Sequence, residues 1–81
     1  MLIVNGKVFV LKDYGNIKLN LAAIMKDRKI SKNKLATYAQ VSPDLVRRYC
    51  ENKILRVDLD ILSRFCFILE CNISDILKYE K

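Results

Sequence analysis

The stretch ISKNKLATYAQVSPDLVRRYCENK, residues 30–53, decides the expected fold, because it has the start and stop signals of two short helices. Ser31 is a good N-cap for a helix over 32–39. Ser42-Pro43-Asp44 then begins a helix over 43–51, with serine as N-cap, proline in the first turn and an acid near the positive end of the helix dipole. The short connection at residues 39–42 therefore predicts a helix-turn-helix.

The apolar residues of this stretch indicate how the two helices pack. Ala36 is small enough to let the second helix approach closely, and Val41 and Val46 fill the space between the two helices. The remaining inward positions are predicted to be Leu35, Ala39, Leu45 and Tyr49. Short corners between helices also occur in proteins that bind nothing, so the joint alone does not establish a function.

Helical spacing continues on both sides of the joint. Ile17, Leu21, Ile24 and Met25 recur at the spacing of one helix face and predict a helix over 17–29. Asn52 adopts the left-handed conformation easily and ends the second helix of the joint. After a loop over 52–57, Asp58 is expected to cap a helix over 59–70, with an inner face of Leu59, Leu62, Phe65, Cys66 and Leu69.

The two ends of the chain complete the expected layout. Ser74 is expected to cap a last short helix from Asp75 to Tyr79, with Ile76 and Leu77 inward. Residues 1–16 form a separate N-terminal arm, in which Asn5-Gly6 is a strong signal for the tight turn of a β-hairpin. Both faces of this hairpin are apolar, and a lone two-stranded hairpin is marginal in water. The arm is therefore expected to pack against something.

Composition limits the range of functions. The 81 residues form one small domain with 15 basic and 9 acidic side chains, a net charge of +6. Residues 29–56 hold seven basic and two acidic side chains, whereas residues 57–81 hold three and five. Lys and Arg must lie outside in any protein, but this uneven distribution favours a polyanionic partner for the joint and its following loop.

Several classes are excluded by what the chain lacks. Histidine is absent, and Cys50, Cys66 and Cys71 show no C-x-x-C spacing, so neither a metal nor another cofactor is expected. Without histidine, a nucleophile–base pair or clustered carboxylates, an enzyme is not expected. No apolar run is long enough for a membrane span, and the N-terminus lacks the features of a signal peptide. The cysteines are expected to stay reduced in a cytoplasmic protein.

The run IKLNLAAIMKDRKISKNKLATYAQVSPDLVRRYCENKILRVDLDILSRFCFILECNISDIL, about residues 17–78, resembles the Cro and lambda-repressor-like (XRE) helix-turn-helix family. Its characteristic parts are ISKNKLA, VSPDLVRRY, ENK with a basic loop, and LDILSRFCFILECNISDIL. The resemblance implies a mostly α, five-helix DNA-binding domain over 17–81, usually dimeric, that acts as a transcriptional regulator. The arm over 1–16 lies outside it.

The resemblance also implies a set of contact residues. The family places its third helix, here about 43–51, in the major groove of double-stranded DNA. The expected base-contacting residues are Ser42, Asp44, Arg47 and Arg48, with Arg48 as the main reader and Arg47 as a reader or a phosphate contact; contact of either arginine with phosphate alone stays open. The expected phosphate contacts are Ser31, Lys32 and Asn33 at the start of the preceding helix, and Lys53 and Arg56 in the loop.

Departures from the family pattern bear on specificity. The family favours glycine where this chain has Lys29, Gln40 and Asn52, so a positive φ at Lys29 or Gln40 would cost about 1 kcal/mol each. Pro43 and Asp44 stand where base-reading amides often occur. Proline cannot donate a hydrogen bond, and aspartate either accepts from cytosine or orients an arginine. Recognition is therefore expected to depend partly on DNA shape.

A second surface is predicted from surplus apolar residues. Ile61, Phe67 and Ile68 are more apolar than the outer side of a helix needs, and the arm offers Ile3, Val8, Phe9 and Val10. Either the arm folds back on its own helices, or a second subunit is bound through the arm or the last two helices. A homodimer is favoured, because the family usually binds two half-sites. The alternative function is a protein-interaction module, such as an antitoxin or adaptor, and the two roles are compatible.

Overall fold

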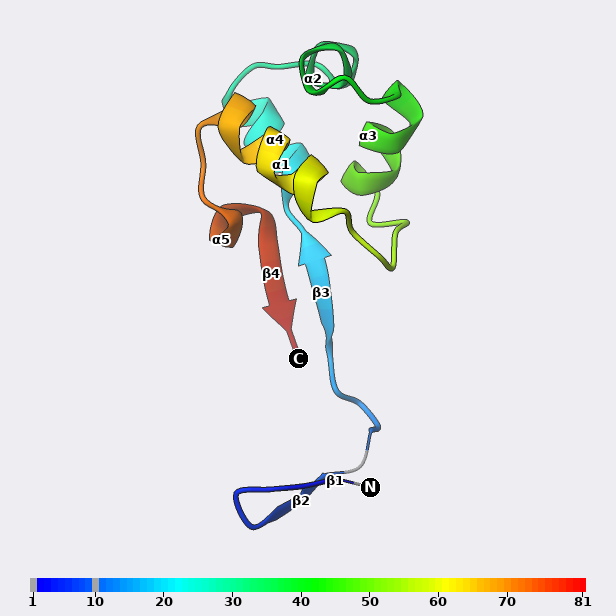
Figure 1. Ribbon diagram of the computed structural model, residues 1–81, viewed down its shortest axis with the longest axis vertical. Helices are drawn as coiled ribbons and strands as arrows, with labels where there is room; N and C mark the ends of the chain where they lie inside the picture. The colour runs from blue at the N-terminus through cyan, green and yellow to red at the C-terminus, as the bar shows by residue number, and fades with distance from the viewer. Residues whose placement is uncertain (1, 10) are drawn as a thin grey trace.

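The computed structural model describes residues 2–9 and 11–81. In these residues five helices are packed together above two separate two-stranded sheets (Figure 1). The helices are α1 (Leu21–Asp27), α2 (Lys32–Ala39), α3 (Pro43–Cys50), α4 (Leu59–Leu69) and α5 (Ile73–Ile76). The strands are β1 (Leu2–Val4), β2 (Lys7–Phe9), β3 (Asn16–Leu19) and β4 (Leu77–Glu80). The mostly α, five-helix fold predicted from the sequence is confirmed.

The core lies between the helices. Tyr49 of α3 and Phe65 of α4 are both fully buried, and their rings meet edge to face with centroids 5.6 Å apart. Burial also confirms most of the predicted inner faces of α2, α3 and α4, although Leu59 is wrong, since it lies in the first turn of α4 and is 77% exposed. The buried residues are Leu19, Leu21, Met25, Leu35, Ala36, Ala39, Val46, Tyr49, Leu62, Phe65, Leu69 and Ile76.

The helix predicted over 17–29 starts later than expected, because residues 16–19 form β3 instead. β3 pairs antiparallel with β4, with Ile17 opposite Tyr79 and Leu19 opposite Leu77. Ile17 and Leu21 are four residues apart, which suits a helix, but Ile17 and Leu19 also alternate as strand residues do. The partner strand lies about sixty residues away, so local spacing alone favoured the wrong element.

The last helix is also shifted relative to the prediction. α5 spans Ile73–Ile76 and is capped by Asn72, which forms a reciprocal capping box with Asp75; Ser74 is inside the helix. The amide of Asn72 donates to the Asp75 carboxylate at 2.9 Å. From Leu77 the chain becomes strand β4, so the predicted helix over 75–79 is wrong beyond Ile76. Ile76 itself is fully buried, as expected.

The predicted N-terminal hairpin is present. Asn5 and Gly6 both have positive φ, 51° and 76°, and β1 pairs with β2 across this turn. The hairpin extends away from the helices (Figure 1), and the side chains of Ile3 and Val8 are exposed. The arm therefore does not fold back on its own helices. Val10 lies outside the described residues, as does the side chain of Phe9.

The predicted apolar surplus on α4 is smaller than the sequence indicated. Ile61 and Ile68 are partly buried and pack against the core, which accounts for their apolar character without a second surface. Phe67 is 85% exposed and is not covered by the arm.

The β3–β4 sheet is joined to its surroundings by side-chain hydrogen bonds at both ends and by a close approach of the backbone at Gly15. The side chain of Asn52 accepts from the Leu19 amide at 2.7 Å and donates to the Leu19 carbonyl at 3.1 Å. At the other end, the Tyr79 hydroxyl donates to the Tyr14 carbonyl at 2.6 Å. Gly15 has φ 80°, and a Cβ there would lie 2.3 Å from the carbonyl oxygen of Glu80. The sheet is thus tied to the loop after α3 and to the chain entering β3.

Candidate nucleic-acid interface

The start of α2 is formed as the sequence predicted. The Ser31 hydroxyl accepts a hydrogen bond from the Lys34 amide at 3.1 Å, and Lys32 and Asn33 follow as the first two helical residues. All three candidate phosphate contacts at this end are exposed. The Ser31 oxygen already caps α2. The groups that can still bind an anion are the Ser31 hydroxyl proton, the exposed side chains of Lys32 and Asn33, and the backbone amides at the start of the helix.

The turn between α2 and α3 is held by hydrogen bonds from both helices and from α4. Gln40 ends α2 with a left-handed φ of 59°, and Val41 donates to the Ala36 carbonyl at 3.0 Å. From α4, the Arg64 guanidinium donates to the Ala39 carbonyl at 2.9 Å, which satisfies a carbonyl at the end of α2. Ser42 then caps α3 by accepting from the Leu45 amide at 3.1 Å. Both helices of the joint are therefore fixed relative to each other.

The three positions where the sequence departs from the family glycines all have positive φ. Lys29, Gln40 and Asn52 have φ of 55°, 59° and 58°. Lys29 and Gln40 therefore adopt the left-handed backbone conformation, which costs about 1 kcal/mol of stability at each position. At Asn52 the backbone strain is offset by two hydrogen bonds between its side chain and Leu19. The sequence did not reveal this role, because the partner is 33 positions away.

The exposed side of α3 carries two arginines in different surroundings. The Arg47 guanidinium forms an ion pair with Asp44 one turn before it and another with Glu51 one turn after it, the latter at 3.2 Å. The hydrogen bond and charge of Arg47 lower the pKa of the Asp44 carboxyl, and Asp44 and then Glu51 raise the pKa of Arg47. Arg47 is thus held along its own helix.

Arg48 has no such partner among residues 2–9 and 11–81. It is exposed on α3 and lines an open surface groove together with the loop after the helix, residues 53–56. Two candidate phosphate contacts, Lys53 and Arg56, line the same groove. Lys53 also pairs with Glu51 at 3.1 Å, and this hydrogen bond is the main cause that lowers the pKa of the Glu51 carboxyl.

The structure therefore brings the candidate residues together in two groups. One group is the exposed side of α3 with its following loop, where Arg48, Lys53 and Arg56 line one groove. The other is the start of α2, the preceding helix of the same joint. Tyr49 links the loop to this joint, because its hydroxyl accepts from the amide of Asp58 at 3.2 Å. Ser42 and Asp44 lie at the start of α3, and each already has an internal partner.

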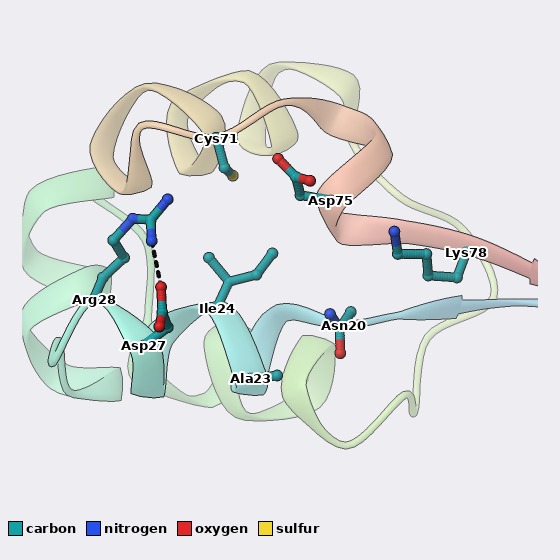
Figure 2. A pocket seen from close by; sticks show the side chains of 8 residues that line it. All are labelled: Asn20, Ala23, Ile24, Asp27, Arg28, Cys71, Asp75 and Lys78. Carbon is teal, nitrogen blue, oxygen red and sulfur yellow. Dashed lines mark hydrogen bonds and ion pairs between the residues drawn. The ribbon is translucent and has the colours of Figure 1, made fainter.

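Arg28, outside these two groups, serves the fold. A second surface pocket, between α1 and the α5–β4 segment, is lined by charged and thiol side chains (Figure 2). There Arg28 pairs with Asp27 and donates from Nε to the Leu69 carbonyl at 2.9 Å, which caps the end of α4. The Cys71 thiol faces the same pocket, and burial is the largest cause that raises its pKa. The arginine of this pocket is thus engaged in holding α1 to α4.

In the part of the chain that the structure describes, no helix is long and apolar enough to cross a membrane. The same residues contain no group of three or more metal-ligating side chains placed to hold an ion.

Comparison with known families identifies the chain. The model of the Cro/C1-type HTH DNA-binding domain matches residues 20–81, which include all five helices. The protein therefore belongs to the Cro/C1-type helix-turn-helix family. No curated protein sequence gives a significant match.

Two solved structures share this fold. One is a protein from Bacteroides fragilis to which DNA binding is ascribed, with a TM-score of 0.71 and 17% identity over 78% of this chain and 100% of the other. The second is the transcriptional regulator VanUg, with a TM-score of 0.67 and 21% identity over 91% of this chain and 97% of the other.

Proposed function

We propose that this protein is a cytoplasmic transcriptional regulator that binds specific sequences of double-stranded DNA, as a small dimeric repressor without catalytic activity or cofactor. Family membership supports DNA binding, and the two structural neighbours are a protein to which DNA binding is ascribed and a transcriptional regulator. The observation that carries the proposal is Arg48, which is exposed on the second helix of the helix-turn-helix, has no ion-pair partner among the described residues and lines one groove with two further cations.

In the proposed complex α3 lies in the major groove, and Arg48 reads a base. Its guanidinium fits the two acceptors of guanine, O6 and N7, a contact worth about 1–3 kcal/mol of discrimination. Arg47 has two roles open to it, a second base contact or a phosphate contact, and both require it to exchange at least one of its carboxylate partners. Asp44 orients Arg47 or accepts from a cytosine amino group, and Ser42 contributes its hydroxyl proton.

The flanking groups are proposed to hold the DNA backbone on both sides of α3. Ser31, Lys32 and Asn33 meet one phosphate segment from the start of α2, and Lys53 and Arg56 meet another from the loop. Each neutralised phosphate releases a counterion, so binding should weaken steeply as salt is added. The carboxylates of Asp44 and Glu51 limit the attraction between α3 and phosphates, so these flanking cations supply most of the affinity that does not depend on sequence.

Selection of bound sequences from a random DNA library tests the proposal. We expect one enriched motif containing guanine, arranged as an inverted repeat because two half-sites bind a two-fold dimer. Arg48→Ala should lower the affinity for the selected site by about 1–3 kcal/mol and leave non-specific binding nearly unchanged.

Lys78→Ala is a matched control for the arginine variant, since it removes one exposed positive charge from β4 and should keep the specificity ratio. Unchanged specific affinity in Arg48→Ala would show that Arg48 is not the base reader. No enrichment at low salt would contradict sequence-specific binding itself.

A protein-interaction module is the second candidate function, and exposed apolar side chains favour it. Ile3 and Val8 of the arm and Phe67 of α4 are all more than half exposed. An antitoxin or adaptor would use such residues to hold another protein. Purification of the chain from its own cell distinguishes the two functions: a stoichiometric protein partner without DNA would support the module over the regulator.

A further inference from the structure

Two of the three cysteines meet at the C-terminal end of α4. Cys66 lies in the last turn of the helix, and Cys71 follows the helix after Glu70, which has a left-handed φ of 51°. The amide of Cys71 donates a hydrogen bond to the carbonyl of Cys66 at 3.1 Å. This bond is typical of a Schellman ending, in which the two residues that it joins commonly also bring their side chains into contact. The backbone therefore places the two thiols on one side of the helix end.

The two thiols are neighbours and can be reached from solvent. Both cysteines are free and partly exposed, and both line one open groove at the end of α4. Burial is the largest cause that raises the pKa of the Cys71 thiol, and the Cys66 thiol raises it further through its charge and a side-chain hydrogen bond. Such a bond requires that the two sulfur atoms lie within contact distance. Figure 2 shows the Cys71 side chain on the segment that follows α4.

The third cysteine has a different setting. Cys50 belongs to α3, and its thiol donates to the sulfur of Met25 at 3.6 Å. Small apolar side chains would fill all three partly buried positions, so packing alone does not require cysteine at any of them. A contacting pair offers chemistry that a single thiol does not, because a disulfide forms readily where the backbone already holds two cysteines within its short range.

We propose that Cys66 and Cys71 form a dithiol site at which low-molecular-weight disulfides close an intrachain disulfide bond. In the first step one cysteine thiolate attacks a sulfur of the small disulfide, whose S–S bond breaks and releases one thiolate. In the second step the other cysteine attacks the protein sulfur of this mixed disulfide and releases the second thiolate. The two cysteine protons pass to the released thiolates, so two protein thiols are oxidised and one small disulfide is reduced to two thiols. In a reducing compartment the bond is transient and follows the balance between the small disulfide and its thiol.

The new bond joins the end of α4 to the segment that leads into α5. On one side of this junction, the Leu69 carbonyl accepts from Nε of Arg28 at the end of α1. On the other side, Asn72 forms the capping box of α5 with Asp75. A crosslink limits the freedom of the unfolded chain, so oxidation is expected to stabilise the domain against unfolding. The junction lies outside both groups of candidate DNA contacts, so the inference goes beyond the proposed function and does not depend on it.

Mass spectrometry of the intact chain in glutathione buffers tests the site. As the ratio of oxidised to reduced glutathione is raised, we expect the chain to become about 2 Da lighter, the mass of the two hydrogen atoms lost. Cleavage after Glu70 by a glutamate-specific protease, under denaturing and non-reducing conditions, should then leave two peptides joined, because the bond that is cut lies between the two cysteines. Added dithiothreitol should separate the peptides.

Cysteine variants identify the two partners. Cys50→Ser is the matched control and should close the bond as the unmodified chain does; Cys50→Ala serves the same purpose if serine disturbs this partly buried position. Made in that background, Cys66→Ser and Cys71→Ser should each stop at a mixed disulfide with one glutathionyl group, because the second attacking thiol is missing. A mixed disulfide that persists on the unmodified chain, or a disulfide that includes Cys50, would overturn the proposal.

Thermal unfolding followed by circular dichroism measures what the bond does to the fold. The oxidised chain should unfold at a midpoint about 5 °C or more above that of the reduced chain. Cys71→Ser should show no such shift in the same buffers. Equal midpoints, or a lower midpoint for the oxidised chain, would contradict the stabilising role. Both measurements are made without DNA, so a chain that closes the bond but binds no duplex would remove the proposed function and leave this inference standing.

Discussion

The two small sheets of this protein are held in opposite ways. The β1–β2 hairpin is made by its turn, where Asn5 and Gly6 supply two adjacent positive φ angles, and its side chains Ile3, Val4 and Val8 remain exposed. The β3–β4 sheet joins segments about sixty residues apart and has no turn of its own. It is held instead by the buried Leu19, by Asn52 and by the close passage of Gly15.

The difference teaches where strand pairing gets its stability. A tight turn brings two strands together at little entropic cost, but it adds no buried area. Distant strands must overcome a larger closure cost, which burial and hydrogen bonds to the core offset. The arm should therefore be removable without loss of the helical fold, whereas the β3–β4 sheet is part of that fold.

The largest expected effect compares one apolar residue from each sheet. Leu19→Ala should lower the free energy of unfolding by about 2–4 kcal/mol, because it removes a buried side chain from the hydrophobic core. Ile3→Ala changes an exposed residue and should cost less than about 0.5 kcal/mol. Urea unfolding followed by helical circular dichroism measures both. Equal losses would mean that the arm packs against the body in solution.

A smaller effect compares the two glycines. Gly15→Ala introduces a methyl group 2.3 Å from the Glu80 carbonyl oxygen at a φ of 80°, so we expect a loss of about 2 kcal/mol or more. Gly6 has a similar φ of 76°, but an added methyl group there meets nothing within 4 Å. Gly6→Ala should weaken the hairpin alone and leave the thermal unfolding of the helices unchanged. A Gly15→Ala variant as stable as the parent would contradict the close passage.

The smallest effect concerns Asn52 and separates backbone strain from hydrogen bonding. Asn52→Gly keeps the positive φ but loses both bonds to Leu19, and should cost about 1 kcal/mol. Asn52→Ala loses the same bonds and adds left-handed strain, for a total of about 2 kcal/mol. The same urea titration resolves the two variants, and glycine at least as stable as asparagine would show that the clamp contributes nothing.

Local signals in the sequence predicted the helical part well. The caps Ser31, Ser42 and Asp58 all accept the expected backbone amides, and the inner faces of α2 and α3 are buried as the spacing indicated. Apart from the exposed Leu59 and the cap of α5, the failures lie at residues 17–19 and 77–79, where strand β3 meets β4. Apolar spacing there fits a helix as well as a strand, and only the distant partner decides between them.

The site was predictable as a list of residues but not as an arrangement of charges. Sequence placed Asp44, Arg47 and Arg48 among the contact residues of one helix. It did not show that Arg47 is held by two carboxylates while Arg48 has no partner among the described residues, because side-chain pairing depends on rotamers. The structure therefore strengthens the choice of Arg48 as the reader without testing it.

The most direct test of the central claim is a titration of the isotopically labelled protein with a selected duplex, followed by amide chemical shifts at low ionic strength. The account predicts the largest changes at the start of α2, along α3 and in the loop at residues 53–56. The amides of the β1–β2 hairpin should stay in place. Changes confined to the hairpin, or none at all, would contradict a DNA-binding face built on the helix-turn-helix.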